Sequence, residues 1–130
     1  MGTIITETML NSSADAAWAM LRDVGAGDRA FPGVLVASEA EGDIRTVTFA
    51  SGNVVRERIV SIDEARRRIA YAVIEGRFQH HSASMQIVPH EAENCRFVWT
   101  TDFLPDEAGA LLTDLIDQGS EAFKHVMEGA

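Results

Sequence analysis

Glu57 and His81 are the residues whose surroundings in this sequence best suit acid–base chemistry. Glu57 lies in an alternating segment in which Val55, Glu57 and Ile59 share one face of a strand, while two arginines share the other. If the apolar face is buried, a lone carboxylate sits among aliphatic side chains, and burial raises its pKa toward that of a general acid or base. The alternative is a structural glutamate tied to an arginine or a backbone amide.

His81 is predicted to point toward the interior of the protein. It shares a strand face with Ala83, Met85 and Ile87, whereas the adjacent His80 must point to the opposite, solvent-facing side. A histidine inside a pocket can exchange a proton with a ligand near neutral pH. The alternative is a core histidine that is satisfied by hydrogen bonds.

Three further residues could contact a ligand. Tyr71 shares a face with Ile69 and Val73, and its phenol can donate or accept a hydrogen bond. Trp99 lies on the apolar face of its strand, and for both aromatics packing in the core is the leading alternative. Arg77 follows Gly76 at a predicted pocket rim, where it could hold a carboxylate. The other residues on the Trp99 face are Cys95, Phe97, Thr101 and Phe103.

The elements that must position these residues are strands and two helices. A first strand over residues 3–9 is followed by a helix that Ser12 or Ser13 caps. Later strands are closely spaced along the chain and joined by short polar turns, which predicts an antiparallel meander. These strands are expected over residues 34–39, 44–50, 54–62, 67–75, 78–88 and 95–103, and Asp106 is expected to cap a long helix that ends near Gly129.

The terminal helix carries a wide apolar stripe, which must be buried against the sheet. A single flat layer could not cover that stripe, so the sheet is expected to curve around the helix and leave a cavity. Gly119 lacks a side chain and could allow a strand or a ligand to approach closely. The residues predicted to contact a ligand are Val55, Tyr71, Val73, Arg77, Ala83, Met85, Trp99, Leu112, Ile116, Gly119 and Phe123.

Length and composition bound the possible functions. The 130 residues fit one domain, over residues 1–130. The net charge of −9 argues against a nucleic-acid partner, and the sequence has neither a signal peptide nor a membrane span, so we expect a cytoplasmic protein. Cys95 is the only cysteine and the histidines lack metal-ligand spacing, so we expect no metal site and no cofactor.

The order of elements and a set of short motifs resemble the START/Bet v 1-like superfamily, also called the helix-grip fold, and within it the polyketide cyclase/dehydrase-like family of small bacterial proteins. The motifs are Ala17-Trp18, Phe31-Pro32-Gly33-Val34, Val55-Arg56-Glu57-Arg58-Ile59, Ile62-Asp63-Glu64, Glu75-Gly76, Val98-Trp99-Thr100 and Phe103-Leu104-Pro105. The resemblance implies an α+β fold in which a curved antiparallel sheet of about seven strands wraps around the C-terminal helix. It also implies a hydrophobic pocket between the two.

Three functions follow from this interpretation. The first is binding of a hydrophobic or amphipathic small molecule by a monomer or homodimer. The second is a cyclase- or dehydrase-type enzyme in which Glu57 or His81 removes a proton next to a carbonyl. The third is a regulatory module that binds a protein through the outer sheet face, where Arg56 and Arg58 lie. On the first two hypotheses, Glu57→Gln should alter ligand affinity or pH dependence and leave the melting temperature within a few degrees.

Overall fold

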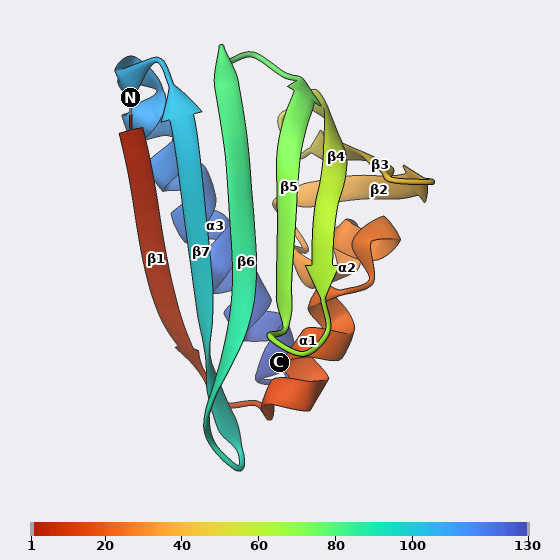
Figure 1. Ribbon diagram of the computed structural model, residues 1–130, viewed down its shortest axis with the longest axis vertical. Helices are drawn as coiled ribbons and strands as arrows, with labels where there is room; N and C mark the ends of the chain where they lie inside the picture. Colours follow the sequence, from red (N-terminus) through yellow and green to blue (C-terminus); the bar gives the residue numbers. More distant parts are fainter. Residues whose placement is uncertain (1, 130) are drawn as a thin grey trace.

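The computed structural model describes residues 2–129, which form one seven-stranded antiparallel sheet and three α-helices (Figure 1). The strands are β1 (Gly2–Leu10), β2 (Leu35–Glu41), β3 (Ile44–Phe49), β4 (Val54–Asp63), β5 (Arg68–Glu75), β6 (His80–Glu91) and β7 (Asn94–Leu104). Their order in the sheet is β1-β7-β6-β5-β4-β3-β2, so β2 to β7 form the predicted meander and β1 pairs with the last strand.

The helices all lie on one side of the sheet (Figure 1). They are α1 (Ala14–Leu21), α2 (Gly27–Ala30) and α3 (Gly109–Met127), with short 3₁₀ turns at Val24–Ala26 and Asp106–Ala108. Ser13 caps α1 by accepting a hydrogen bond from the backbone N–H of Ala16. The final helix differs in detail from the prediction, because Asp106 begins a 3₁₀ turn and the α-helix proper begins at Gly109.

The sheet curves around α3, as Figure 1 shows by the strong turn of the β2–β3 hairpin away from the other strands. Irregularities in the pairing of β4 with β5 contribute to this bend, since a β-bulge kinks its strand and increases the local twist. They occur between Arg56 and Glu57 and between Ile59 and Ser61. The bend therefore lies directly beside the buried carboxylate of Glu57.

The core lies between the concave face of the sheet and the helices. Phe97 and Phe123 are fully buried, with ring centroids 4.7 Å apart. The predicted inward face of β7 is confirmed, because Cys95, Phe97, Thr101 and Phe103 are all buried. Trp99 packs against both hydrophobic clusters of the core. This position makes Trp99 part of the wall between the packed core and the cavity beside α3.

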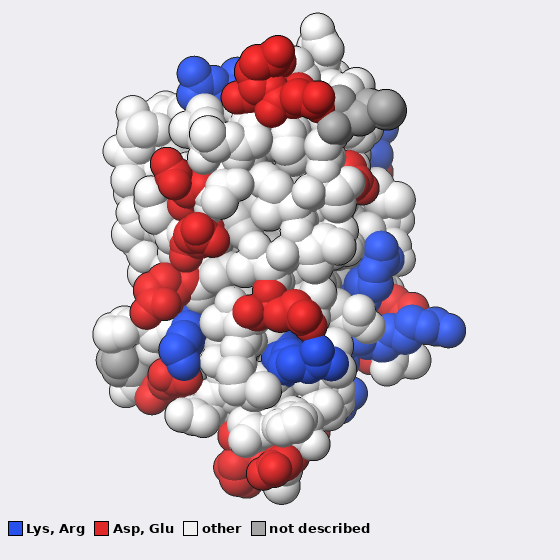
Figure 2. Space-filling view, turned by 90° about the vertical axis from the view of Figure 1, so that its left-hand side faces the viewer, with Lys and Arg blue, Asp and Glu red and all other residues white. Residues whose placement is uncertain are grey.

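Acidic side chains outnumber basic ones in this protein, with 20 Asp and Glu against 11 Lys and Arg. Figure 2 shows one face of the molecule, on which red carboxylate side chains are more prominent than blue cationic ones and no continuous basic patch occurs. This agrees with the net charge of −9. Among residues 2–129, none of the helices has the length and apolar character needed to cross a membrane.

Candidate ligand-binding site

Two adjoining chambers lie between the concave face of the sheet and α3. The inner chamber offers about 70 Å³ of space to the centre of a water molecule, and the outer chamber about 210 Å³. Five lining residues belong to both chambers, so the two lie side by side and share part of their walls. The shared residues are Phe49, Glu57, His81, Leu112 and Leu115.

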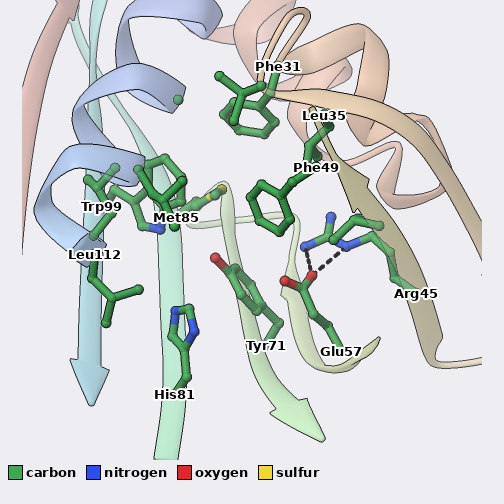
Figure 3. Close-up of a pocket in the computed structure, with 15 residues that line it drawn as sticks. Phe31, Leu35, Arg45, Phe49, Glu57, Tyr71, His81, Met85, Trp99 and Leu112 are labelled. Atoms are coloured by element: carbon green, nitrogen blue, oxygen red, sulfur yellow. Dashed lines mark hydrogen bonds and ion pairs between the residues drawn. The ribbon is translucent and has the colours of Figure 1, made fainter. Parts of the chain in front are cut away.

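Glu57 points into this cavity, but it is not a lone carboxylate: the alternative interpretation of the sequence, a glutamate tied to an arginine, is confirmed. Its Oε1 atom accepts a hydrogen bond of 2.8 Å from Nε of Arg45 and lies 2.7 Å from a terminal guanidinium nitrogen of the same residue (Figure 3). Both side chains are buried, with 6% of Glu57 and 8% of Arg45 exposed. Burial raises the pKa of the Glu57 carboxyl, whereas the charge and hydrogen bond of Arg45 oppose that increase.

Arg45 is a cavity-lining residue that the sequence analysis missed. It lies directly opposite Glu57 in the pairing of β3 with β4. The sequence does contain a sign of this position. Arg45 is two residues before Val47 and four before Phe49, so in a strand it must share their inward face. Only the register between the two strands shows that Arg45 meets Glu57.

Tyr71 lies beside this ion pair on β5. The guanidinium carbon of Arg45 is 5.2 Å from the centroid of the Tyr71 ring, a cation–π arrangement. Burial raises the pKa of the Tyr71 phenol far above its ordinary value, and the Glu57 carboxylate raises it further. The Tyr71 hydroxyl is therefore protonated at physiological pH and can donate a hydrogen bond.

His81 lies on β6 where the two chambers meet. Burial lowers the pKa of the imidazole to about 4, with a smaller contribution from neighbouring His80. His81 is thus neutral at pH 7 and presents one donor and one acceptor nitrogen. The Phe78 ring packs edge-on against it, with centroids 6.1 Å apart. As predicted, His80 is on the exposed side of the strand.

Trp99 and Gly119 shape the inner wall of the cavity. A Cβ atom added to Gly119 would lie 2.8 Å from Cζ3 and 3.0 Å from Cη2 of Trp99, so the missing side chain allows the indole to pack against α3. This confirms the predicted close approach at Gly119. Within the part of the chain that the structure describes, Nε1 of Trp99 is a buried donor without a hydrogen bond of good geometry, and the Tyr71 hydroxyl is the nearby group that interacts with it weakly.

Most of the predicted ligand-contacting residues line the cavity. The inner chamber contains Tyr71, Met85, Trp99, Leu112, Ile116 and Gly119, and the outer chamber contains Val55, Val73, Arg77 and Leu112. Arg77 is exposed at the mouth, with its guanidinium carbon 5.9 Å from the Phe78 ring centroid.

Two predicted contacts require correction, because Ala83 and Phe123 line neither chamber. Ala83 faces the concave side but is covered by the packed core. Phe123 is fully buried between Phe31 and Phe97, with ring centroids at 5.6 and 4.7 Å. Periodicity correctly identified the inward faces of β6 and α3. It could not show how far along each element the cavity extends.

Several lining residues were not predicted as ligand contacts. They come from the segment after α2 and from β2, β3 and α3. These residues are Phe31, Val34, Leu35, Val47, Phe49 and Leu115. Over residues 2–129, histidine, cysteine and carboxylate side chains form no group of three that could hold a metal ion.

The curved sheet gripping a long terminal helix defines the START/Bet v 1-like, or helix-grip, class of proteins. The chain belongs to the family described as polyketide cyclase/dehydrase and lipid transport, whose model matches residues 1–128. No curated protein matches the chain.

Solved structures with the same fold include proteins from bacteria and a plant. An uncharacterised protein from Bacillus thuringiensis is 16% identical with a TM-score of 0.88, and the alignment covers 97% of this chain and 98% of that one. A protein from Thermobifida fusca is 27% identical with a TM-score of 0.78, covering 96% and 89%. Norcoclaurine synthase from Thalictrum flavum, solved in complex with dopamine and hydroxybenzaldehyde, is 20% identical with a TM-score of 0.68, covering 92% and 84%.

Proposed function

We propose that this protein binds a hydrophobic or amphipathic small molecule in the cavity between the sheet and α3. The observation that carries the proposal is the composition of the cavity wall, in which aromatic and aliphatic side chains surround a few convergent polar groups. Small-molecule sites in proteins commonly have this composition. The family description, which includes lipid transport, supports the same class of ligand.

The polar residues of the cavity would have different roles in binding. Tyr71 and His81 reach the inner chamber as neutral groups and would contact the polar part of a ligand. Glu57 is held by Arg45, so the pair would fix the Tyr71 ring and the shape of the wall. Arg77 at the mouth would meet any anionic group that extends toward solvent.

A fluorescence titration with N-phenyl-1-naphthylamine, an uncharged apolar probe, tests the proposal. Val73 lines the outer chamber, and its neighbour Ile74 is on the outer face of the same strand. We expect Val73→Phe to fill part of the outer chamber and weaken probe binding by at least about tenfold, equivalent to about 1.4 kcal/mol. The matched control Ile74→Phe should bind the probe within about twofold of the original protein.

Native mass spectrometry of the freshly purified protein provides an independent readout. A small molecule bound in the cavity should be retained by the original protein and by Ile74→Phe, and lost from Val73→Phe. If the original protein does not bind the probe, or if both variants bind it equally well, the cavity is not the binding site and the proposal fails.

A second candidate is an enzyme of the cyclase or dehydrase kind, and the position of His81 favours it. A neutral imidazole where the chambers meet has a free acceptor nitrogen that could remove a proton next to a ligand carbonyl. Glu57, the other predicted acid–base residue, fits this role less well because its carboxylate is already bound by Arg45.

Turnover of a poly-β-keto model substrate by the original protein, His81→Ala and Glu57→Gln separates the two candidates. Catalysis by His81 predicts a loss of about 10²-fold or more in kcat for His81→Ala. An equal rate in all three proteins leaves binding as the function.

The third hypothesis from the sequence, a regulatory module that binds a protein through the outer sheet face, loses support. Arg56 and Arg58 are each within 3.3 Å of a carboxylate and do not form a free basic patch.

A further inference from the structure

Two tryptophans in this protein have opposite hydrogen-bonding states. Trp18 donates its indole N–H to Oε1 of Glu64 at 2.7 Å. Nε1 of Trp99 is buried in the wall of the inner chamber and makes no hydrogen bond of good geometry, although the Tyr71 hydroxyl is close enough to interact with it weakly. A buried donor with only a poorly aligned partner is unfavourable, so a ligand oxygen that accepts from both Trp99 and Tyr71 would satisfy Trp99 better than the Tyr71 hydroxyl alone does.

Packing holds the Trp99 indole in an orientation that faces the cavity. The six-membered ring contacts the space left by Gly119, and the Phe31 and Phe97 rings lie 5.7 and 5.8 Å away. Since Cζ3 and Cη2 are on the edge of the indole remote from Nε1, the N–H is turned away from α3. Figure 3 shows the Trp99 nitrogen and the Tyr71 hydroxyl on the same side of the chamber, above His81.

The inner chamber offers hydrogen-bond donors but no uncompensated charge. Its one cation, Arg45, is neutralised by Glu57 at 2.7 Å. Tyr71 keeps its proton and His81 is neutral. A buried anion without a partner is strongly unfavourable, whereas an uncharged oxygen acceptor matches two nearby donors without any cost of ionisation.

The geometry points to a ligand whose buried end is an uncharged carbonyl group on an apolar ring system, with Trp99 and Tyr71 donating hydrogen bonds to its oxygen. This inference rests on the proposed binding function and adds the chemical class of the ligand and the residues that select it. Trp99 and Tyr71 are then specificity-determining residues, whereas the Glu57–Arg45 pair is a positioning pair.

Three probes of similar size separate the possible ligand classes. These are 2-acetylnaphthalene, which has the carbonyl, 2-ethylnaphthalene, which is the matching hydrocarbon, and 2-naphthoate, which is the matching anion. The direct readout is the pair of indole N–H signals in a ¹H–¹⁵N correlation spectrum of the intact protein. Trp18→Phe assigns the two signals and leaves the cavity unchanged, because Trp18 lines neither chamber.

We expect 2-acetylnaphthalene to move the Trp99 indole proton downfield of its position with 2-ethylnaphthalene, a comparison that removes ring-current effects common to both probes. Trp99→Phe and Tyr71→Phe should each weaken binding of the ketone by about threefold to tenfold, and change hydrocarbon binding by less than about twofold. The spectrum of the original protein keeps the test valid even if Trp99→Phe folds poorly.

Different failures have different meanings. If the ketone and the hydrocarbon give the same chemical shift for the Trp99 indole proton, and both lose affinity equally in the variants, the carbonyl inference is wrong. The proposed binding function still holds in that case, because both probes bind. Tighter binding of 2-naphthoate than of the ketone also overturns the carbonyl inference. If none of the three probes binds, the proposed function fails together with the inference.

Discussion

Arg45 changes what can be expected of Glu57. Removing one partner of a buried ion pair leaves the other charge uncompensated, at a cost of about 3–5 kcal/mol. A glutamine can still accept one hydrogen bond from Arg45, so we expect Glu57→Gln to lower the free energy of unfolding by about 2–4 kcal/mol, measured by urea denaturation. This replaces the small effect that the sequence analysis expected if Glu57 is an unpaired carboxylate in a ligand site.

Two control variants show whether the buried charge is the cause. Glu75→Gln breaks an ion pair with Arg56 in which the Glu75 side chain is 66% exposed, and should change stability little. The double variant Arg45→Met/Glu57→Leu removes both charges and should be more stable than Glu57→Gln alone. A double variant that is less stable than the single one would show that the pair is strongly stabilising in its own right.

His81 gives the stability of the protein a specific dependence on pH. Its pKa falls from 6.5 to about 4 on folding, so the folded state binds the proton less tightly than the unfolded state. The stability associated with neutral His81 is complete above pH 6.5 and is lost as the pH falls toward 4. Between pH 7 and pH 5 this linkage amounts to about 2 kcal/mol.

Urea denaturation at these two pH values measures the effect. His81→Gln should lose less stability between pH 7 and pH 5 than the original protein, by about 2 kcal/mol. An exposed histidine at the far end of the same strand provides the control, and His90→Gln should follow the original protein. Equal pH dependence in His81→Gln and the original protein would contradict the buried, neutral state of His81.

At the scale of the elements, the contact between α3 and β7 depends on Gly119. Alanine improves helix propensity by about 1 kcal/mol, but its Cβ would lie 2.8 Å from the Trp99 ring. Overpacking of this kind costs about 1–3 kcal/mol, so we expect Gly119→Ala to lower the free energy of unfolding by up to about 2 kcal/mol and to push Trp99 into the cavity.

The coupling between the two residues can be measured with a double-mutant cycle. Gly119→Ala should cost less in the Trp99→Phe background, because the smaller ring removes the clash. Gln118→Ala, at an exposed position of the same helix, should leave both stability and probe binding nearly unchanged. If Gly119→Ala lowers the free energy of unfolding equally in both backgrounds, its effect does not come from the contact with Trp99.

Alternation and helical spacing were enough to predict which face of β4, β5, β6, β7 and α3 is buried. They placed Glu57 and His81 inward and Val54 and Val60 outward, and the structure agrees. They could not show that Arg45 faces Glu57, because that pairing depends on the register between β3 and β4. They also could not show where along an element the cavity ends, so Ala83 and Phe123 were predicted as contacts although packed neighbours cover them.

At the scale of the whole molecule, the cavity leaves part of the concave face without packed neighbours. Close-packed interiors contain few voids, and each void forfeits dispersion contacts, so an unfilled cavity lowers stability. A ligand that binds only the folded state returns this stability by mass action, by about 2.7 kcal/mol at a concentration one hundred times its dissociation constant. The cavity therefore links the stability of the fold to occupancy of the site.

The central claim is that a small apolar molecule enters the space between the sheet and α3. A methyl ¹H–¹³C titration with N-phenyl-1-naphthylamine tests it most directly. We predict shifts confined to methyl groups that line the two chambers, such as those of Leu112, Leu115 and Ile116, with none at Ile5 or Val60 on the exposed outer face. Shifts on the outer face alone, or no saturable shift at the chamber methyl groups, would contradict the claim.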